Sequence, residues 1–229
     1  MDPGVFDPST FSGRVPIFPL HNVVLFPHAF LPLHVFEPRY RAMTADARAG
    51  EGLIAMAMFQ PGWEKDYYGN PPVRDVIGIG KIVEHHLLDD GRCNIVLYGV
   101  SRARIVEEVS QNPYRVSKVD LLEDRPEKAK KYERLRRLLL QFYNELLRNA
   151  LKGDSAPPPP PPDLPLGLLC DQLSSLIGLD AAVKQALLED LEVEARCDRL
   201  VSLLESSVGL GSEPGVPPKG AWPPSPSVN

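Results

Sequence analysis

The stretch that decides the fold is Val15-Pro16-Ile17-Phe18-Pro19-Leu20, followed by Leu31-Pro32-Leu33-His34-Val35-Phe36-Glu37-Pro38-Arg39-Tyr40-Arg41. Short apolar runs alternate with prolines, and proline fixes its own φ and favours extended backbone in the residue before it. The pattern changes at Glu37-Pro38, because proline suits the first turn of a helix and a carboxylate is favourable beside a helix N-terminus. The stretch therefore predicts strands followed by one helix, over residues 38–49 and ended by Gly50.

Most of the first half of the sequence has strand character. The clearest hairpin turn is Asp89-Asp90-Gly91, because Asp-Gly tolerates the positive φ that tight turns require. Near residues 114–121 the apolar alternation slips by one position, which predicts a bulge or a change of face. The predicted strands are 15–20, 30–36, 53–59, 76–87, 93–100, 103–109 and 114–121.

The second half of the sequence has helical periodicity. Further helices are predicted at 165–177, 181–190 and 192–206, with Asp163 and Asp180 as N-caps. Over residues 128–151, apolar side chains recur every three or four residues at Tyr132, Leu135, Leu139, Phe142, Leu146 and Ala150.

Composition shifts define the predicted organisation. Residues 1–13 are expected to form a disordered tail, residues 14–123 a β-rich lobe and residues 124–208 a helical bundle. The bundle contains a Pro-rich loop at 154–163, and residues 209–229 are rich in Gly, Pro and Ser and are expected to be disordered.

Charge and cysteine usage narrow the classes of function. The net charge of −5 argues against nucleic acid as the main partner. Cys93, Cys170 and Cys197 lie far apart in the sequence, which suggests neither a disulfide framework nor a zinc site. The N-terminus lacks a signal-peptide pattern, and no apolar run approaches the ~20 residues that span a bilayer. We expect a cytoplasmic protein.

Several longer pieces of sequence resemble one family. They are Pro16-Ile17-Phe18-Pro19-Leu20, Val24-Leu25-Phe26-Pro27, Leu31–Tyr40, Ile77-Gly78-Ile79-Gly80-Lys81-Ile82, Asp90–Ile95, Tyr98–Ile105 and Val183–Glu189. Together they resemble the N-terminal, substrate-binding domain of Lon proteases over most of the sequence.

The resemblance implies an α+β fold, in which a PUA-like pseudo-barrel lobe is followed by an α-helical bundle. It also implies recognition of exposed or unfolded protein segments. Lon continues into an ATPase and a Ser–Lys peptidase, and this sequence has no Walker A loop: Asp75 and Ile82 stand where its Gly and Ser/Thr belong around Gly80-Lys81. We therefore expect a stand-alone, non-enzymatic binding module without a cofactor.

The best candidate for client contact is an aromatic segment in a Gly/Pro-rich loop. Phe59, Trp63, Tyr67 and Tyr68 lie there, and aromatic side chains offer large contact area at low entropic cost. The alternative is that Trp63 or Tyr67 closes one end of the barrel. Both interpretations stay open.

Other polar residues favour a structural role. Arg39 and Arg41 are expected to satisfy buried carbonyls or carboxylates between the two lobes. The sequence has five histidines, and His85 and His86 are adjacent in a predicted strand, so they point to opposite faces and do not share a metal ion. No catalytic or metal site is predicted.

Charge is unevenly distributed between the predicted helices. Residues 125–152 carry nine basic and three acidic side chains, and residues 163–205 carry the reverse. The favoured interpretation is that these opposite charges pair with one another within the bundle. The protein would then bind client proteins as an adaptor or regulator for a separate protease. Such binding should depend little on salt. The alternative function is RNA binding by a PUA-like protein through helix 128–152, which would depend steeply on salt. A small-molecule sensor is a third possibility, and no membrane partner is expected.

Overall fold

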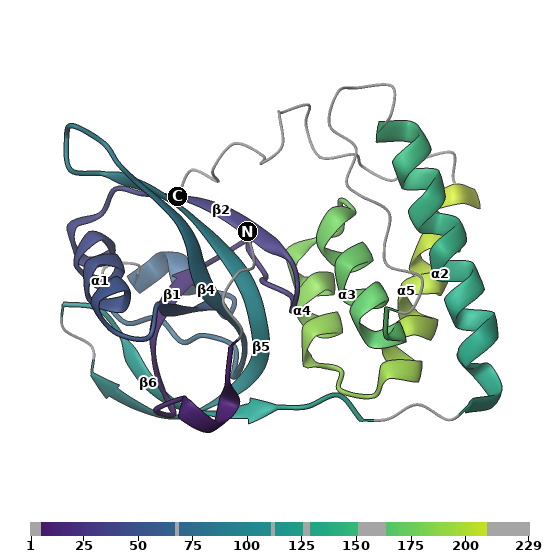
Figure 1. The fold of residues 1–229 in the computed structure, drawn as a ribbon, viewed down its shortest axis with the longest axis horizontal. Coiled ribbons are helices and arrows are strands. Elements are labelled where there is room, and N and C mark those ends of the chain that lie inside the picture. The colour runs from purple at the N-terminus through teal and green to yellow at the C-terminus, as the bar shows by residue number, and fades with distance from the viewer. Residues whose placement is uncertain (1–5, 67–68, 111–112, 126–128, 151–163, 210–229) are drawn as a thin grey trace. The chain divides into compact units, whose positions relative to one another are not determined.

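The structure, a computed structural model, describes residues 6–66, 69–110, 113–125, 129–150 and 164–209 (Figure 1). The chain divides into two compact units after Leu122, where the sequence predicted a boundary between 123 and 124. We call the first the barrel unit and the second the helical unit.

The barrel unit is built on one mixed sheet. Its strand order is β2-β5-β4-β3-β1-β6, and β6 also pairs with β5, so the sheet closes on itself. Strands β1 and β3 are parallel, with Ile17 opposite Ala55, and the other strand pairs are antiparallel. The strands are β1 (Arg14–Leu20), β2 (Phe30–Val35), β3 (Leu53–Met58), β4 (Val76–Leu87), β5 (Cys93–Ser110) and β6 (Val116–Leu122). This arrangement confirms the α+β class and the closed, β-rich lobe.

Strand β5 corrects one prediction, because residues 93–100 and 103–109 form a single strand. Its first half pairs with β2 and its second half with β6, while β4 runs beside both halves. Arg102, at the predicted break, is 3% exposed and pairs with Gly78. The sequence predicts a bulge within 114–121, but the extra residues lie on the partner strand: Val106 and Val109 of β5 are unmatched opposite β6.

A short segment after β1 packs against the outer face of β4 and β5, because Gly78 lies between Ile77 and Ile79, whose side chains point into the barrel core. Leu25 is 2% exposed and Phe26 is fully buried. A Cβ atom at Gly78 would lie 1.9 Å from the Leu25 carbonyl oxygen, and one at Gly99 would lie 2.0 Å from that of Phe26. The Gly99 amide also donates a hydrogen bond to the Ala29 carbonyl. These glycines therefore make room for a second backbone against β4 and β5.

Helix α1 (Pro38–Ala49) has the bounds that the sequence predicts, with Glu37 at its N-cap and Gly50 at its C-cap. Its buried residues recur at helical spacing and pack toward β1 and β3. They are Tyr40, Met43, Thr44 and Ala47.

The predicted disordered tail at 1–13 is wrong for residues 6–13. Phe6 and Phe11 form an edge-to-face pair with ring centroids 5.9 Å apart, and both pack against the barrel core. A short 3-10 helix, η1 (Pro8–Thr10), lies between them, and the Ser12 amide donates to Glu51. Burial of the two rings holds this segment on the barrel.

The helical unit has four described helices. Helix α2 packs against α3 and α5. The predicted apolar face of α2 is confirmed at Leu135, Leu139 and Leu146, but Tyr143 is buried in preference to Phe142. The helices are α2 (Ala129–Ala150), α3 (Leu166–Leu176), α4 (Ala181–Glu189) and α5 (Val193–Gly209).

The predicted N-caps and loops of the helical unit are only partly described by the structure. Asp180 is the N-cap of α4, but its side chain makes no capping hydrogen bond. Asp163, the loop at 154–163 and residues 210–229 lie outside the described residues. Within the described ranges, every helix is too short or too polar to cross a bilayer.

Candidate functional site

The predicted aromatic segment forms a stack at one end of the barrel. Phe59 follows β3, and its ring lies 5.2 Å from that of Trp63 at an interplanar angle of 11°. Trp63 opens the 3-10 helix η2 (Trp63–Asp66) and also stacks on His21, 5.1 Å away at 16°. We call these three rings the aromatic stack.

The predicted site residues differ in how much surface they expose. Phe59 is 5% exposed and belongs to the barrel core, so its ring supports Trp63 and presents little surface itself. Trp63 is half-buried and packs against that core. Tyr67 and Tyr68 lie outside the described residues.

Sequence reasoning missed His21 as a member of the stack. His21 directly follows β1, and the Phe59 amide donates to the Leu20 carbonyl, 3.0 Å away. Because β1 and β3 are parallel, the residues after both strands meet at one edge of the sheet. Placing His21 beside Trp63 would have required knowing that β1 and β3 pair in parallel.

A pocket opens beside the aromatic stack and shares Phe59 with it. Counting its open mouth, it holds about 300 Å³ of empty space. Its wall includes Arg39 and Tyr40 from α1, Pro71 from the loop after η2, and Tyr114 and Arg115 from the start of β6. We call it the two-arginine pocket.

Each arginine of this pocket is held by an acidic partner. The Nε and Nη2 atoms of Arg39 each lie 3.0 Å from Glu37 Oε2, and its guanidinium lies over the Tyr40 ring, 4.6 Å from the centroid. Arg115 donates through Nε to Glu108 and through Nη1 to the Pro71 carbonyl at 2.8 Å. Arg39 is paired with a carboxylate, as predicted, but this carboxylate belongs to Glu37 of the same unit and not to a position between the lobes.

Tyr114, which also lines the pocket, is held by a hydrogen bond. Its hydroxyl donates a hydrogen bond to Asp46 Oδ2 at 2.7 Å. Burial, then this hydrogen bond and the charge of Asp46, raise the pKa of Tyr114 to about 12. Tyr114 is therefore a neutral hydrogen-bond donor at physiological pH.

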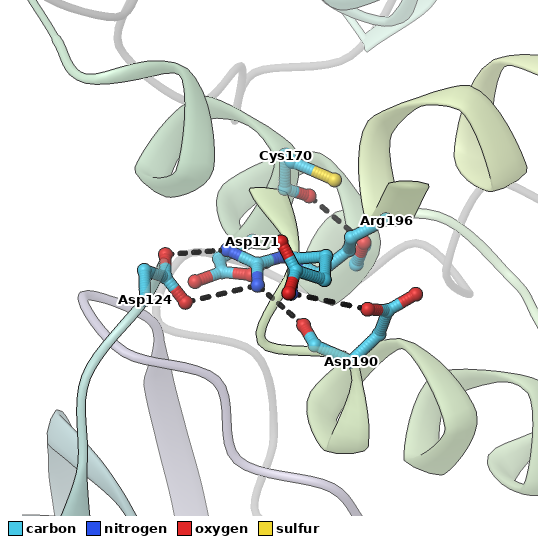
Figure 2. Close-up of polar contacts among 7 residues, drawn as sticks. Asp124, Cys170, Asp171, Asp190 and Arg196 are labelled. Carbon is cyan, nitrogen blue, oxygen red and sulfur yellow. Dashed lines mark hydrogen bonds and ion pairs between the residues drawn. The ribbon is translucent and has the colours of Figure 1, made fainter. Parts of the chain in front are cut away.

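The helical unit contains a buried charge network that sequence reasoning missed (Figure 2). Arg196 of α5 is fully buried and forms a two-pronged pair with Asp124, at 2.9 and 2.6 Å. Its Nη1 donates to the Asp190 carbonyl at 2.6 Å, and its Nε lies 3.3 Å from Asp171 of α3. The sequence did contain a signal for this burial. Arg196 lies three residues after the buried Val193, so helical spacing places it on the apolar face of α5.

This network holds the helical unit together and offers no open site. Burial alone lowers the pKa of Arg196, but its hydrogen bonds to Asp124 and the charges of Asp171 and Asp124 outweigh burial and leave that pKa raised. Gly167 lies close beside it: a Cβ atom there would lie 2.5 Å from Asp124 Oδ2, so a larger residue would displace the Asp124 carboxylate.

Two cysteine thiols lie next to this network. Cys170 and Cys197 are both fully buried, and neither forms a disulfide. A hydrogen bond with Cys170, followed by burial, raises the pKa of Cys197. A protonated, enclosed thiol is a poor nucleophile. In the described ranges, His, Cys, Asp and Glu side chains form no group of three able to hold a metal ion.

The chain belongs to the family of the ATP-dependent protease La (LON) substrate-binding domain, whose model matches residues 14–206. The matched range includes all six strands of the barrel unit, helices α1 to α4 and most of α5.

Similar proteins include complete Lon proteases. The chain is 27% identical over 198 residues to the Lon protease of Desulfosudis oleivorans and 28% identical over 204 residues to that of Dictyoglomus thermophilum. These matches cover 86% and 83% of this chain but 24% of each relative. The chain thus spans about a quarter of the length of these relatives.

Two solved structures share the fold. The Lon N-terminal domain protein from Xanthomonas campestris has a TM-score of 0.60 and 22% identity, covering 82% of this chain and 97% of that one. The N-terminal domain of Mycobacterium avium complex Lon protease has a TM-score of 0.62 and 19% identity, covering 84% and 98%. At these identities the likeness concerns the fold alone.

Proposed function

We propose that this protein binds exposed apolar segments of client proteins, without catalytic activity of its own, as an adaptor or regulator of proteolysis. The observation that carries the proposal is the match of a substrate-binding domain family across residues 14–206, a range that extends over both units. A cytoplasmic location is part of the proposal, and the three buried, free cysteines suit a reducing compartment.

The aromatic stack is the proposed contact surface for the client. Trp63 is half-buried on rings that fix its orientation, so little side-chain entropy is lost when a client covers it. Apolar burial contributes about 25 cal/mol per Å², from which the ordering of a flexible client subtracts, so we expect micromolar affinity. Phe59 supports Trp63 from below, and Tyr67 and Tyr68 remain proposed contacts.

Fluorescence anisotropy tests this proposal against RNA binding. A labelled, permanently unfolded polypeptide and a labelled single-stranded RNA are each titrated with the full-length protein at low and high salt. Saturable, salt-insensitive binding of the polypeptide supports the proposal. Salt-sensitive binding of RNA alone would overturn it and favour the basic helix α2, because phosphate contacts release counterions.

Substitution of Trp63 tests the contact surface. Trp63→Ala should weaken polypeptide binding at least tenfold, as loss of a central aromatic contact does. Leu87→Ala is the matched control, because Leu87 is a 64% exposed apolar side chain at the end of β4 and outside the aromatic stack. Trp222→Phe leaves Trp63 as the only tryptophan, so its emission reports contact directly. Unchanged affinity in a folded Trp63→Ala protein would exclude Trp63 as a contact.

A further inference from the structure

The two-arginine pocket has a composition suited to one particular chemical group. Arg39 and Arg115 both line it, from elements far apart in the sequence. Guanidinium groups present several N–H donors in one plane, a geometry that matches the two oxygens of a carboxylate. Pocket walls built from two such groups therefore favour a planar, acidic ligand.

Both guanidinium groups are held in place before any ligand arrives. The side chains of Arg39 and Arg115 are 26% and 12% exposed, and Glu37 and Glu108 fix their Nε edges. Among the described residues, Arg115 Nη2 has no acceptor, so this nitrogen can donate to a ligand. Donors that are already oriented lose little entropy on binding.

The size of the pocket limits what enters. Its empty space of about 300 Å³ includes open solvent at the mouth, so the enclosed space is much smaller than this figure. Proline walls at Pro19, Pro71 and Pro113 restrict how far it can widen. The pocket therefore admits one terminal group of a larger ligand.

The charges around the pocket set the mode of recognition. Glu37 and Glu108 neutralise the two arginines, and Asp46 lies behind Tyr114. Long-range attraction of an anion is thus weak, and affinity must come from directed hydrogen bonds, such as one donated by Arg115 Nη2. Such binding depends on the exact shape of the ligand more than on salt.

We propose that the two-arginine pocket binds a carboxylate of the client polypeptide, while the neighbouring aromatic stack holds an apolar side chain of the same segment. The shared Phe59 places the two surfaces side by side. This inference rests on the proposed function and names the class of client: an apolar segment that carries a carboxylate, either at the C-terminus of the client or on an acidic side chain.

Three short labelled peptides, rich in Leu and Phe, test the proposal by anisotropy with the full-length protein. The first has a free C-terminal carboxylate and no acidic side chain, the second a C-terminal amide, and the third the same amide with one internal Glu. The first or the third should bind about tenfold more tightly than the second, since one hydrogen bond to a charged group contributes about 1.5 kcal/mol. Which of the two does so identifies the source of the carboxylate.

Variants assign the effect to the pocket. Arg115→Gln and Arg39→Gln should each abolish the preference for the acidic peptide, while binding of the amide peptide changes less than twofold. Arg115→Lys keeps the charge but loses the planar donors, so most of the preference should still disappear. Arg104→Gln is the matched control, because Arg104 is exposed on β5 and outside the pocket wall.

The outcomes separate this inference from the proposed function. Equal affinity for all three peptides would overturn the carboxylate pocket and leave client binding intact. Absence of binding to every peptide and to the unfolded polypeptide would overturn both. A carboxylate preference that survives in Arg115→Gln and Arg39→Gln would place the acidic site elsewhere and overturn the inference. The peptide comparison uses the unmodified protein, so it tests the preference for a carboxylate even where a variant fails to fold.

Discussion

At the scale of single residues, Gly78 and Gly99 determine whether the segment that contains Leu25 and Phe26 can pack against β4 and β5. Gly78→Ala would place a Cβ atom 1.9 Å from the Leu25 carbonyl oxygen, and backbone on both sides prevents simple adjustment. We expect the free energy of unfolding to fall by about 3 kcal/mol or more, at the upper end of overpacking. Urea unfolding followed by tryptophan fluorescence measures it.

Gly50→Ala is the matched control for this prediction. The nearest atom to a Cβ at Gly50 is the Asp46 carbonyl oxygen at 3.5 Å, an ordinary contact. Its effect should stay below about 1 kcal/mol. Equal losses in Gly78→Ala and Gly50→Ala would show that the segment containing Leu25 moves easily, contrary to the tight packing described above.

The environment of Tyr114 predicts how the stability of the barrel unit changes at alkaline pH. Burial, the hydrogen bond to Asp46 and the negative charge of Asp46 raise its pKa from 10.0 to about 12. The folded state therefore holds this proton more tightly than the unfolded state. The resulting stabilisation is complete below pH 10 and is lost as the pH rises through about 12.

Comparison with Tyr114→Phe measures this effect. The wild type should be more stable than Tyr114→Phe below pH 10, and the difference should shrink between pH 10 and 12. In the Asp46→Asn control, the pKa of Tyr114 should lie nearer its ordinary value. A stability difference that stays constant across this range would show that Tyr114 ionises normally.

At the scale of helices and strands, Arg196 links the connection into the helical unit with α3 and α5. Its replacement leaves Asp171, which is fully buried, beside an apolar side chain. Breaking one partner of a buried ion pair costs about 3–5 kcal/mol. We expect Arg196→Met to lower the free energy of unfolding by this amount, measured by urea denaturation and circular dichroism at a helical wavelength.

Arg199→Met on the same helix is the control. Arg199 is 51% exposed and lies 4.0 Å from Asp190, so its loss should change stability by less than about 1 kcal/mol. Adding Asp171→Leu to Arg196→Met should recover part of the loss, because the buried carboxylate that loses Arg196 is removed. A double variant less stable than Arg196→Met would contradict this explanation.

Elements defined by local chemistry could be predicted from the sequence, and elements defined by long-range pairing could not. Helix α1 follows from Pro38 and Gly50, and the β4–β5 hairpin follows from Gly91, whose φ is 81°. The parallel pairing of β1 with β3, which brings His21 to Trp63, depends on residues nearly forty positions apart and has no local signal. Of the predicted aromatic residues, Phe59 and Trp63 lie together, Tyr67 and Tyr68 lie outside the described residues, and client contact stays a prediction. The two-arginine pocket was not predicted.

At the scale of the whole molecule, the barrel unit has the components of an independent folding unit. Its core cluster draws only on residues before Leu122, including Val15, Ile77 and Val119. The sheet closes within the same range, so its pairing needs no strand from the helical unit. Domains with their own core can fold alone.

We therefore expect a fragment of residues 1–122 to fold cooperatively. Trp63 is its only tryptophan, so its emission should report one sigmoidal urea transition that coincides with the transition seen by circular dichroism. Gly78→Ala in the fragment should shift that transition to lower urea, as in the full-length protein, because Leu25 lies within the fragment. Non-coincident or gradual transitions would show that the closed sheet alone is insufficient and that the helical unit contributes to the stability of the barrel.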